Sequence, residues 1–375
     1  MSKFAIVAGA RPNFMKIAPL MRQFASRIDA GAGSSVLLVH TGQHYDEKMS
    51  ESFFRDLGIP APDVNLEVGS GSHASQTARI MTAFEEFCQR ERPDWVVVVG
   101  DVNSTVACAI TAKKLGIRVA HVEAGLRSRD MSMPEEINRL CTDSISDLLF
   151  TTDRIASENL AKEGVSPEKI RFVGNVMIDT LYSNLDRARS LPTPCGLTQG
   201  DYAVVTLHRP ANVDTSETLT PILKMIREIS NRLPIIFPIH PRTRKSIETH
   251  GLGAIVQNDC QIHLLEPMSY LPFISCVVGS RMVLTDSGGI QEETAVLGIP
   301  CLTMRYNTER PITCECGTNV LVGDDPKRIL AAFENVMAGR VVQRQIPEFW
   351  DGRAAERIVA DLLGMQTRSV AANAI

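Results

Sequence analysis

The 375-residue sequence lacks the long apolar runs that a membrane-spanning helix requires. Its longest runs, such as residues 95–99, have the length of a strand, and none approaches the roughly 18 residues of a spanning segment. The first residues, MSKF, lead into a short apolar stretch without the layout of a signal peptide. We therefore expect a cytoplasmic protein with no membrane partner.

The sequence also lacks a charge excess and paired cysteines. Lys and Arg total 39 against 43 Asp and Glu, and the formal net charge of −4 argues against a large basic surface for nucleic acid. The nine cysteines include no CxxC pair, and no histidine cluster follows the close pair Cys314 and Cys316. We interpret them as reduced thiols that act as small core residues. A local site, rather than the overall field, must hold any anionic ligand.

Strand-like and helix-like segments alternate along the whole chain. Continuous apolar runs separated by amphipathic segments are typical of parallel sheets with helices on both faces. The predicted strands cover residues 4–7, 36–40, 95–99, 118–122, 148–151, 203–207, 235–239, 261–264, 282–285 and 300–303. Amphipathic segments such as 76–90, 104–115, 219–231 and 290–297 lie between them. The sequence therefore predicts an α/β fold of doubly wound parallel sheets.

A stretch rich in proline and glycine divides the chain. Residues 191–200 read LPTPCGLTQG and interrupt the alternation. At about 150 residues per domain, the length suits two domains. We predict an N-terminal α/β domain over 1–173 and a C-terminal α/β domain over 174–351, with a ligand cleft between the carboxyl ends of their strands. A last helix in residues 352–375 is expected to pack back on the N-terminal domain.

A turn in the second domain that follows a predicted strand and opens a helix is a candidate anion site. Its residues Ser287, Gly288 and Gly289 let a ligand approach the backbone closely, and the free N–H groups at the helix start favour a diphosphate. The carboxylates one turn later could accept hydrogen bonds from a ribose. The alternative is a capped helix without a ligand. A catalytic serine in a nucleophile elbow has a glycine two residues before it. Ser287 does not match this pattern, and the residue directly before it is Asp286.

The first domain has a similar turn at residues 9–16. There, Arg11 and Lys16 add positive charge near the expected cleft. The turn does not match GxGxxG, so a dinucleotide-binding signature is absent and we expect no cofactor. Both cations could instead be solvated surface residues.

Acidic side chains stand at the ends of predicted strands in the first domain. Asp101 and Glu123 each follow such a strand, and Glu135 and Glu136 stand at the start of a predicted helix. The carboxyl ends of parallel strands meet at the edge of the sheet where active sites lie. Asp101 could be an N-cap, and acids suit a helix start, but acids gathered at one edge indicate acid/base chemistry.

Two histidines of the second domain, His208 and His240, also follow predicted strands and would face the cleft. A metal site is another use of histidine in this sequence, and it would combine His40, His44, His121 and Glu123. No HExxH or similar helical spacing supports that site, so we expect no metal.

Taken in order, these motifs resemble the non-hydrolysing UDP-N-acetylglucosamine 2-epimerases over nearly the whole chain. The resemblance is carried by residues 9–16 (GARPNFMK), 41–44 (TGQH), 99–101 (VGD), 121–127 (HVEAGLR), 134–139 (PEEINR), 208–209 (HR), 284–293 (LTDSGGIQEE) and 308–311 (TERP). It implies the two-domain glycosyltransferase-B architecture, a UDP-sugar substrate and a homodimer.

The family reaction inverts carbon 2 of the sugar in UDP-GlcNAc and gives UDP-ManNAc. A base removes the carbon-2 proton, UDP leaves by anti elimination to give 2-acetamidoglucal, and UDP adds back while a proton returns to the opposite face. By resemblance, the catalytic positions are Asp101, Glu123, Glu135 and His208. Asp101 and Glu123 are the candidates for the proton transfers, and His208 and Arg11 would stabilise the departing diphosphate.

The resemblance also assigns contacts to the nucleotide and to a regulator. The nucleotide positions are Ser287, Gly288 and Gly289 for the diphosphate, Glu293 for the ribose, Phe273 for the uracil, and Lys16 and Arg310 in the cleft wall. Part of a second, regulatory UDP-GlcNAc site is matched by Gln43, His44, Arg209 and His240. Residues 45–46 and 69–73 replace other polar residues of that site. We therefore do not expect activation by substrate.

Three alternatives to this reaction stay open at this point. Sister enzymes with nearly the same motifs epimerise UDP-2,3-diacetamido-2,3-dideoxyglucuronate, whose carboxylate needs a cation such as Arg127 or Arg129. A glycosyltransferase would use the same fold and nucleotide turn, but it would leave the paired strand-end acids of the first domain unused. A nucleotide-sugar sensor would leave all the acid/base residues without a task. We expect UDP-GlcNAc as the substrate.

Overall fold

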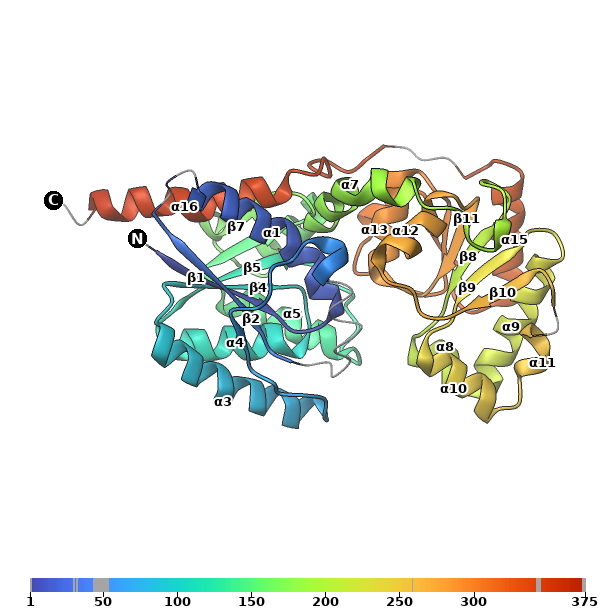
Figure 1. Ribbon diagram of the computed structural model, residues 1–375, viewed down its shortest axis with the longest axis horizontal. Helices are drawn as coiled ribbons and strands as arrows, with labels where there is room; N and C mark the ends of the chain where they lie inside the picture. The colour runs from blue at the N-terminus through green and yellow to red at the C-terminus, as the bar shows by residue number, and fades with distance from the viewer. Residues whose placement is uncertain are drawn as a thin grey trace. The chain divides into compact units, whose positions relative to one another are not determined.

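The computed structural model describes residues 2–29, 31, 33–42, 54–257, 259–341 and 345–372, apart from the side chains of Arg11 and residues 365–372. The chain forms two compact units, unit 1 (Met1–Tyr182 and Glu348–Ile375) and unit 2 (Ser183–Pro347). Each unit is a parallel sheet with helices on both faces (Figure 1), which confirms the predicted α/β class.

The division between the units lies inside helix α7 (Val176–Arg189), whereas the sequence places the domain boundary after residue 173. The first half of α7 packs on unit 1. Its residues Ile178 and Leu181 are fully buried, and the Thr180 hydroxyl donates to the Met15 carbonyl at 2.5 Å. These contacts hold the start of α7 against unit 1.

In the described residues, unit 1 has a parallel sheet of seven strands in the order β3-β2-β1-β4-β5-β6-β7. Its strands are β1 (Lys3–Ala8), β2 (Ser35–His40), β3 (Val64–Asn65), β4 (Trp95–Val99), β5 (Arg118–Ala124), β6 (Leu148–Thr151) and β7 (Ile170–Phe172). The strand order reverses between β1 and β4. In doubly wound sheets this switch point is where ligands bind, just beyond the carboxyl ends of the strands.

The helices of unit 1 form a layer on each face of this sheet. They are α1 (Arg11–Asp29), α3 (His73–Glu91), α4 (Asn103–Lys114), α5 (Pro134–Ile145), α6 (Arg154–Lys162), α7 and α16 (Ala354–Ala372). Figure 1 shows α1 and α16 on one face and α3 and α4 on the other.

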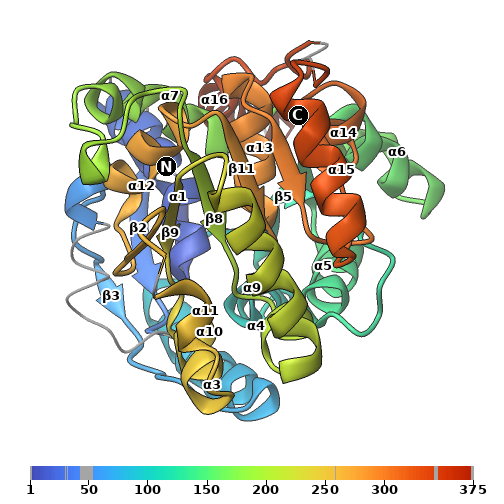
Figure 2. The same ribbon diagram turned by 90° about the vertical axis from the view of Figure 1, so that its right-hand side faces the viewer.

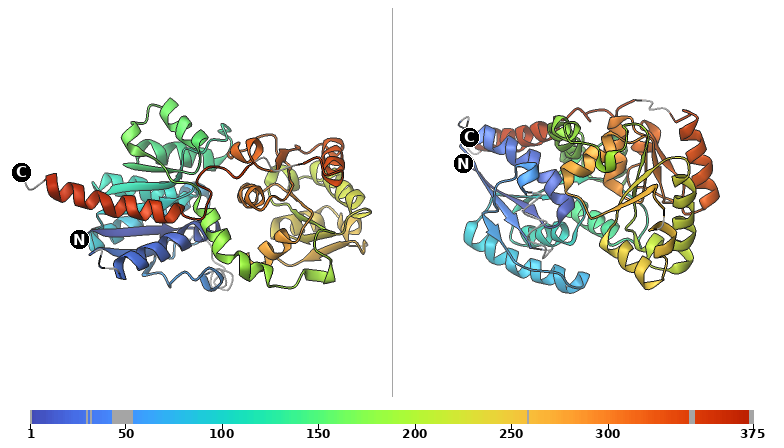
Figure 3. Two further views of the ribbon diagram at one scale, coloured as in Figure 1. Left: turned by 90° about the horizontal axis from the view of Figure 1, so that it is seen from above. Right: turned by 45° about the vertical axis from the view of Figure 1, so that its right-hand side comes forward.

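The C-terminal helix α16 returns to unit 1 and packs alongside α1 (Figure 3). Asp179 on α7 anchors its start, since its carboxylate accepts hydrogen bonds from the backbone N–H groups of Ala354 and Ala355 at 3.1 and 2.7 Å. Burial of Ile358, Val359 and other apolar side chains then holds the helix to the unit.

Unit 2 repeats the pattern, with six parallel strands in the described residues and the order β10-β9-β8-β11-β12-β13. The strands are β8 (Ala203–Thr206), β9 (Ile235–Pro238), β10 (Ile262–Leu265), β11 (Met282–Thr285), β12 (Cys301–Thr303) and β13 (Asn319–Leu321). The helices are α8 (Pro210–Val213), α9 (Ser216–Ser230), α10 (Pro241–Thr249), α11 (Gly253–Val256), α12 (Tyr270–Val278), α13 (Gly288–Leu297), α14 (Ile312–Glu315) and α15 (Pro326–Met337). Helices α9 and α15 cover one face, and α12 and α13 cover the other (Figure 2). Here the switch point lies between β8 and β11.

The structure departs from the sequence analysis in two details of the fold. The short edge strands β3, β7 and β13 were not predicted, because two or three residues carry no periodic signal. All nine cysteines are free, but Cys141, Cys195 and Cys260 are exposed, so the cysteines are not all core residues as expected. Within the residues described, no helix has the length and apolar character to cross a membrane.

Candidate active site

In unit 1 the strand ends at the switch point bring Glu123 against Lys16. Glu123 stands near the end of β5, where the pairing with β6 shifts register between Val122 and Ala124. Its φ of 72° is a left-handed conformation that a non-glycine residue adopts at a cost of about 1–3 kcal/mol. The carboxylate is 2 % exposed, and its Oε2 lies 2.5 Å from the Lys16 Nζ. A strained, buried ion pair at a strand end is typical of a functional site.

Lys16 is therefore not a solvated surface residue, since it is only 4 % exposed. Gly100, after β4, makes room for its ammonium group. A Cβ at Gly100 would lie 2.6 Å from the Lys16 Nζ, and the glycine has a φ of +64°. Lys16 thus lies between Gly100, which directly precedes Asp101, and the carboxylate of Glu123.

The turn before Lys16 differs from the predicted anion site. The backbone N–H groups of Gly9 and Ala10 donate to the Asn13 Oδ1 at 2.9 and 3.1 Å, so the chain itself uses them. The Asn13 amide in turn donates to the Val99 carbonyl at 3.0 Å, which ties this turn to the end of β4. The side chain of Arg11 lies outside the described residues.

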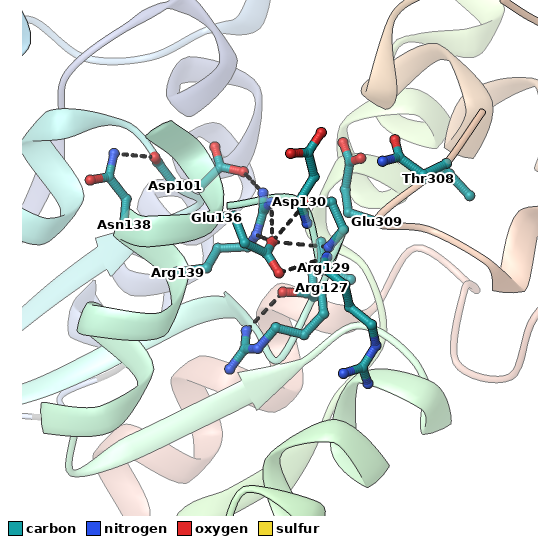
Figure 4. A network of polar contacts seen from close by, with 12 residues as sticks. Asp101, Arg127, Arg129, Asp130, Glu136, Asn138, Arg139, Thr308 and Glu309 are labelled. Carbon is teal, nitrogen blue, oxygen red and sulfur yellow. Dashed lines mark hydrogen bonds and ion pairs between the residues drawn. The ribbon is translucent and has the colours of Figure 1, made fainter. Parts of the chain in front are cut away.

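Asp101 is held by an arginine from α5. Its carboxylate forms an ion pair with the guanidinium of Arg139, which is buried (Figure 4). The second arm of Arg139 reaches the Glu136 Oε2 at 2.6 Å. Arg139 was not predicted as a site residue, although its position three residues after Glu136 on one helix face was a usable signal.

The neighbours Glu135 and Glu136 have different surroundings. Glu136 is buried and accepts the N–H groups of Ser128 and Arg129 at 2.9 and 2.8 Å. Burial alone would raise the pKa of Glu136, but these N–H groups and Arg139 hold it below the usual value. Glu135 is half-buried, and no hydrogen bond or ion pair of its carboxylate is found in the described part of the chain. Glu136 therefore supports the loop, whereas Glu135 has no such structural contact in the described residues.

In unit 2 the switch point brings His208 against Asp286. The His208 Nδ1 lies 2.7 Å from the Asp286 Oδ1, and the N–H groups of His208 and Arg209 donate to the same carboxylate at 3.0 and 2.8 Å. Burial would raise the pKa of Asp286, but His208 and these N–H groups lower it overall. The ionised carboxylate accepts the Nδ1 proton. The imidazole side chain is 39 % exposed, so Asp286 holds a ring that remains accessible.

The predicted diphosphate turn opens helix α13, and Ser287 occupies the N-cap position without a side-chain hydrogen bond to the helix. Gly288 packs closely on two charged residues, because a Cβ there would lie 2.7 Å from the Glu309 Oε1 and 2.8 Å from the Arg310 Nη1. A side chain at position 288 would therefore collide with Glu309 and Arg310, whether or not a ligand is bound.

Arg310, predicted to line the cleft, is engaged by two buried acids. Its Nε lies 2.7 Å from the Glu292 Oε1, and its Nη1 lies 2.6 Å from the Glu309 Oε1. Arg305 reaches the other oxygen of Glu309 at 2.8 Å. Burial would raise the pKa of Glu309, but Arg310, Arg305 and Arg209 hold it far below the usual value. Arg310 therefore braces the start of α13, and Glu309 and Arg305 are members of this cluster that the sequence analysis missed.

Glu293, the predicted ribose contact, is buried one turn into α13 and accepts the hydroxyl of Tyr270 at 3.0 Å. Burial raises the pKa of Glu293 to about 8, and Glu292 adds to the rise while the Tyr270 hydrogen bond opposes it. The carboxyl is therefore neutral at pH 7. Phe273, predicted to contact uracil, lies on the same helix as Tyr270 and is partly buried against the core.

The candidate regulatory residues are only partly described. Arg209 donates from its Nε to the Asp286 carbonyl at 2.8 Å, and His240 is the N-cap of α10, where its Nδ1 accepts the Arg242 N–H at 3.2 Å. The rings of His208 and His240 lie 5.6 Å apart. Gln43 and His44 fall outside the described residues.

The alternative metal site has no counterpart in the described residues, where no three His, Cys, Asp or Glu side chains gather as ligands. The Nε2 of His121 donates to the Gly100 carbonyl oxygen at 2.8 Å instead, and Glu123 pairs with Lys16. His44 lies outside the described residues.

Comparison with known proteins gives consistent results. The sequence model of the family described as UDP-N-acetylglucosamine 2-epimerase matches residues 27–363. A UDP-N-acetylglucosamine 2-epimerase of Methanococcus maripaludis is 40 % identical over 371 residues, covering 97 % of this chain and 99 % of the relative. A UDP-2,3-diacetamido-2,3-dideoxy-D-glucuronate 2-epimerase of Pseudomonas aeruginosa is 41 % identical over 360 residues, covering 95 % and 98 %. The crystal structure of the Methanocaldococcus jannaschii UDP-GlcNAc 2-epimerase with UDP-GlcNAc and UDP has a TM-score of 0.87 and 41 % identity, covering 96 % of this chain and 99 % of that one.

Proposed function

Because the chain belongs to the UDP-N-acetylglucosamine 2-epimerase family, we propose that it interconverts UDP-GlcNAc and UDP-ManNAc. It is an isomerase with a glycosyltransferase-B-like fold. The observation that carries the proposal is the pair of carboxylates Asp101 and Glu123, which stand at neighbouring strand ends with Lys16 beside both segments. Inversion at carbon 2 needs two acid/base positions, one for each face of the sugar.

The reaction proceeds by elimination and re-addition. One of the two carboxylates takes the carbon-2 proton, the bond from carbon 1 to the diphosphate breaks, and UDP leaves as an anion. UDP then adds back to carbon 1 of 2-acetamidoglucal, and the other carboxyl group returns a proton to the opposite face of carbon 2. Glu135 is a further acid/base candidate. The imidazole of His208, when both ring nitrogens carry protons, donates from Nε2 to the diphosphate as its charge grows.

Unit 2 supplies the proposed contacts to the nucleotide. Backbone N–H groups of Gly288 and Gly289 at the start of α13 bind the diphosphate, as helix N-termini bind anions generally. The N–H of Ser287 donates to the Thr285 Oγ1 at 2.9 Å, so Ser287 contributes through its hydroxyl. The neutral carboxyl of Glu293 contacts the ribose, and Phe273 contacts the uracil. Neutrality of Glu293 suits this place, because an ionised carboxylate would repel the diphosphate.

The charges of unit 1 favour UDP-GlcNAc over the diacetamido uronate. Arg127 is buried, and its guanidinium is engaged by Asp143 at 2.7 Å and by Glu163 at 2.6 and 2.8 Å. Arg129 donates to the Asn159 side chain at 3.1 Å. The two arginines that could pair with a uronate carboxylate thus have partners within the protein. A neutral sugar needs neither of them.

Three further features are proposed on the resemblance. The active protein is a homodimer that works in the cytoplasm. Arg11 and Lys16 assist the diphosphate and the base, respectively. Gln43, His44, Arg209 and His240 do not make a working regulatory site, because residues 45–46 and 69–73 replace its other polar groups.

The test is solvent exchange at carbon 2. UDP-GlcNAc is incubated with the protein in D₂O without added NAD or metal, and proton NMR follows the sugar. We expect the carbon-2 proton signal to disappear as UDP-ManNAc forms. A product that keeps its original hydrogen would contradict elimination. Conversion of the diacetamido uronate with UDP-GlcNAc left inert would keep the mechanism and refute the substrate.

A further inference from the structure

A fully buried imidazole lies beside the acid/base residues of unit 1. His121, in β5, has no exposed surface. Its Nε2 lies 2.8 Å from the Gly100 carbonyl oxygen, and its Nδ1 lies 2.6 Å from the Asp143 Oδ1. A carbonyl oxygen can only accept, so Nε2 carries a proton and donates it to Gly100.

Asp143 on α5 is the second member of this cluster. Its Oδ2 lies 2.7 Å from the Arg127 Nη1 and accepts the Gly125 N–H at 3.1 Å. Burial would raise the pKa of Asp143, but His121 and Arg127 hold it below the usual value. Asp143 thus lies between the imidazole of His121 and the guanidinium of Arg127, and both of its carboxylate oxygens are engaged.

The cluster joins the three segments that hold the proposed acid/base groups. Gly100 directly precedes Asp101, and His121 is two residues before Glu123 on the same strand. Gly125 is two residues after Glu123 and lies in the turn that follows this residue, whose φ is strained. Asp143 lies on α5, the helix that carries Glu135. A shift of this cluster would therefore move Asp101 and Glu123 relative to each other.

We propose that His121 and Asp143 are positioning residues, which fix the Gly100 carbonyl and the turn after Glu123 and thereby set Asp101 and Glu123 for the two proton transfers. The inference rests on the proposed function, because it takes these two carboxylates as the acid/base pair. The polar atoms of both side chains are engaged within unit 1, His121 by Gly100 and Asp143, and Asp143 by His121, Arg127 and Gly125, so we assign them a positioning role and no contact with substrate. Misplacement of reacting groups by about 1 Å can reduce turnover about 100-fold.

The activity test compares Asp143→Asn and His121→Gln with a control, Asp147→Asn. Asp147 anchors the opposite end of β5, where it accepts the Val119 N–H at 2.7 Å and pairs with Lys113 at 2.8 Å. Both carboxylates thus support the same strand, but only Asp143 lies at its catalytic end. We expect kcat to fall roughly 10- to 100-fold in both cluster variants and to stay near the parent value in the control. UDP affinity by calorimetry should stay near the parent value in all three, because the proposed UDP contacts lie in unit 2.

Two outcomes would overturn the proposal: parental kcat in folded Asp143→Asn and His121→Gln, or an equal loss of kcat in the Asp147→Asn control. The parent protein is assayed first with both candidate sugars. If it shows no carbon-2 exchange with either sugar, the proposed function fails on its own, before any variant is compared.

A second measurement needs no variant that must fold well. Nitrogen-15 NMR of the histidine side chains should show the Nε2 of His121 protonated in the parent protein, as a hydrogen bond to the Gly100 carbonyl requires. The signal is assigned by its loss in His121→Gln. An Nε2 without a proton would refute the cluster as described, whether or not the protein is active.

Discussion

The two units have the same doubly wound sheet and place acids at the same edge of it, but they surround those acids differently. In unit 1, Asp101 and Glu123 each meet a cation, Arg139 and Lys16. In unit 2, the buried Glu293 meets a tyrosine hydroxyl, and burial raises its pKa to about 8. Placement near this edge alone therefore does not set the charge state of a carboxyl group; burial and the nearest partner do.

The difference matches two chemical tasks. A group that takes a proton must be available as an anion, and a neighbouring cation stabilises that form. A group beside a bound diphosphate is better neutral, because like charges repel. These surroundings agree with the proposal that unit 1 carries out the proton transfers and unit 2 binds the diphosphate. Four predictions test this comparison, in order of expected effect.

The largest effect is expected in unit 1. Asp101→Asn and Glu123→Gln are nearly isosteric and remove a proton acceptor, so turnover should fall by a factor of about 10² to 10⁴. UDP affinity by calorimetry should stay close to that of the parent. The surface variant Glu158→Gln, whose exposed carboxylate lies 3.4 Å from Arg154, is the control and should retain full activity. Parental turnover in both variants would contradict the assignment.

The next effect is expected at the start of α13. In Gly288→Val, the new side chain meets Glu309 and Arg310 at 2.7 and 2.8 Å from its Cβ and displaces the turn. UDP affinity should fall at least about tenfold, which is 1.4 kcal/mol. Ser287→Ala keeps the backbone N–H groups and should change affinity much less. Titrations with UDP decide, and equal losses in the two variants would argue against binding through the backbone.

A pH-dependent effect is expected at Glu293. As pH rises through about 8, Glu293 ionises, and UDP affinity should decrease. The same shift affects folding: because the folded pKa is raised, the stabilisation is complete below the usual value of 4.5 and is lost as pH rises to about 8. Glu293→Gln should remove both dependences. Calorimetry and urea unfolding at pH 6 and pH 9 measure them, and an unchanged pH dependence in the variant would refute the role of Glu293.

The smallest effect is expected at Asp179, the anchor of α16. Burial raises its pKa to about 6, while the Ala355 and Ala354 N–H groups oppose the rise. Its contribution to stability is therefore present below the usual 3.8 and is lost as pH rises through about 6. Asp179→Asn keeps one acceptor for the helix start and should change the free energy of unfolding at pH 7 by only about 1 kcal/mol. Urea unfolding between pH 4 and pH 7 measures how the free energy of unfolding changes with pH. We expect this change to be smaller in the variant than in the parent, with UDP affinity unchanged. An equal change in both proteins would assign the pH dependence to another group.

The sequence by itself determined the α/β class and which polar residues lie at the carboxyl edges of the two sheets. Continuous apolar runs that alternate with amphipathic segments indicate parallel sheets, because both faces of such strands are covered. Motifs directly after those runs must lie at the carboxyl edge. For that reason the places of Asp101, Glu123, His208 and Ser287 in the fold were predictable without the structure, and their roles in the reaction stay predictions.

Tertiary structure alone decided what each of these residues touches. The pairs that define the site join residues far apart in the chain: Lys16 with Glu123, Arg139 with Asp101, and His208 with Asp286. A local sequence pattern indicates the secondary structure of one segment. An ion pair between distant residues depends on how two segments pack, and a short stretch of sequence does not contain that information. The same reason explains why the buried acids that engage Arg310, Glu292 and Glu309, and the support of His121 by Asp143 were visible only after folding.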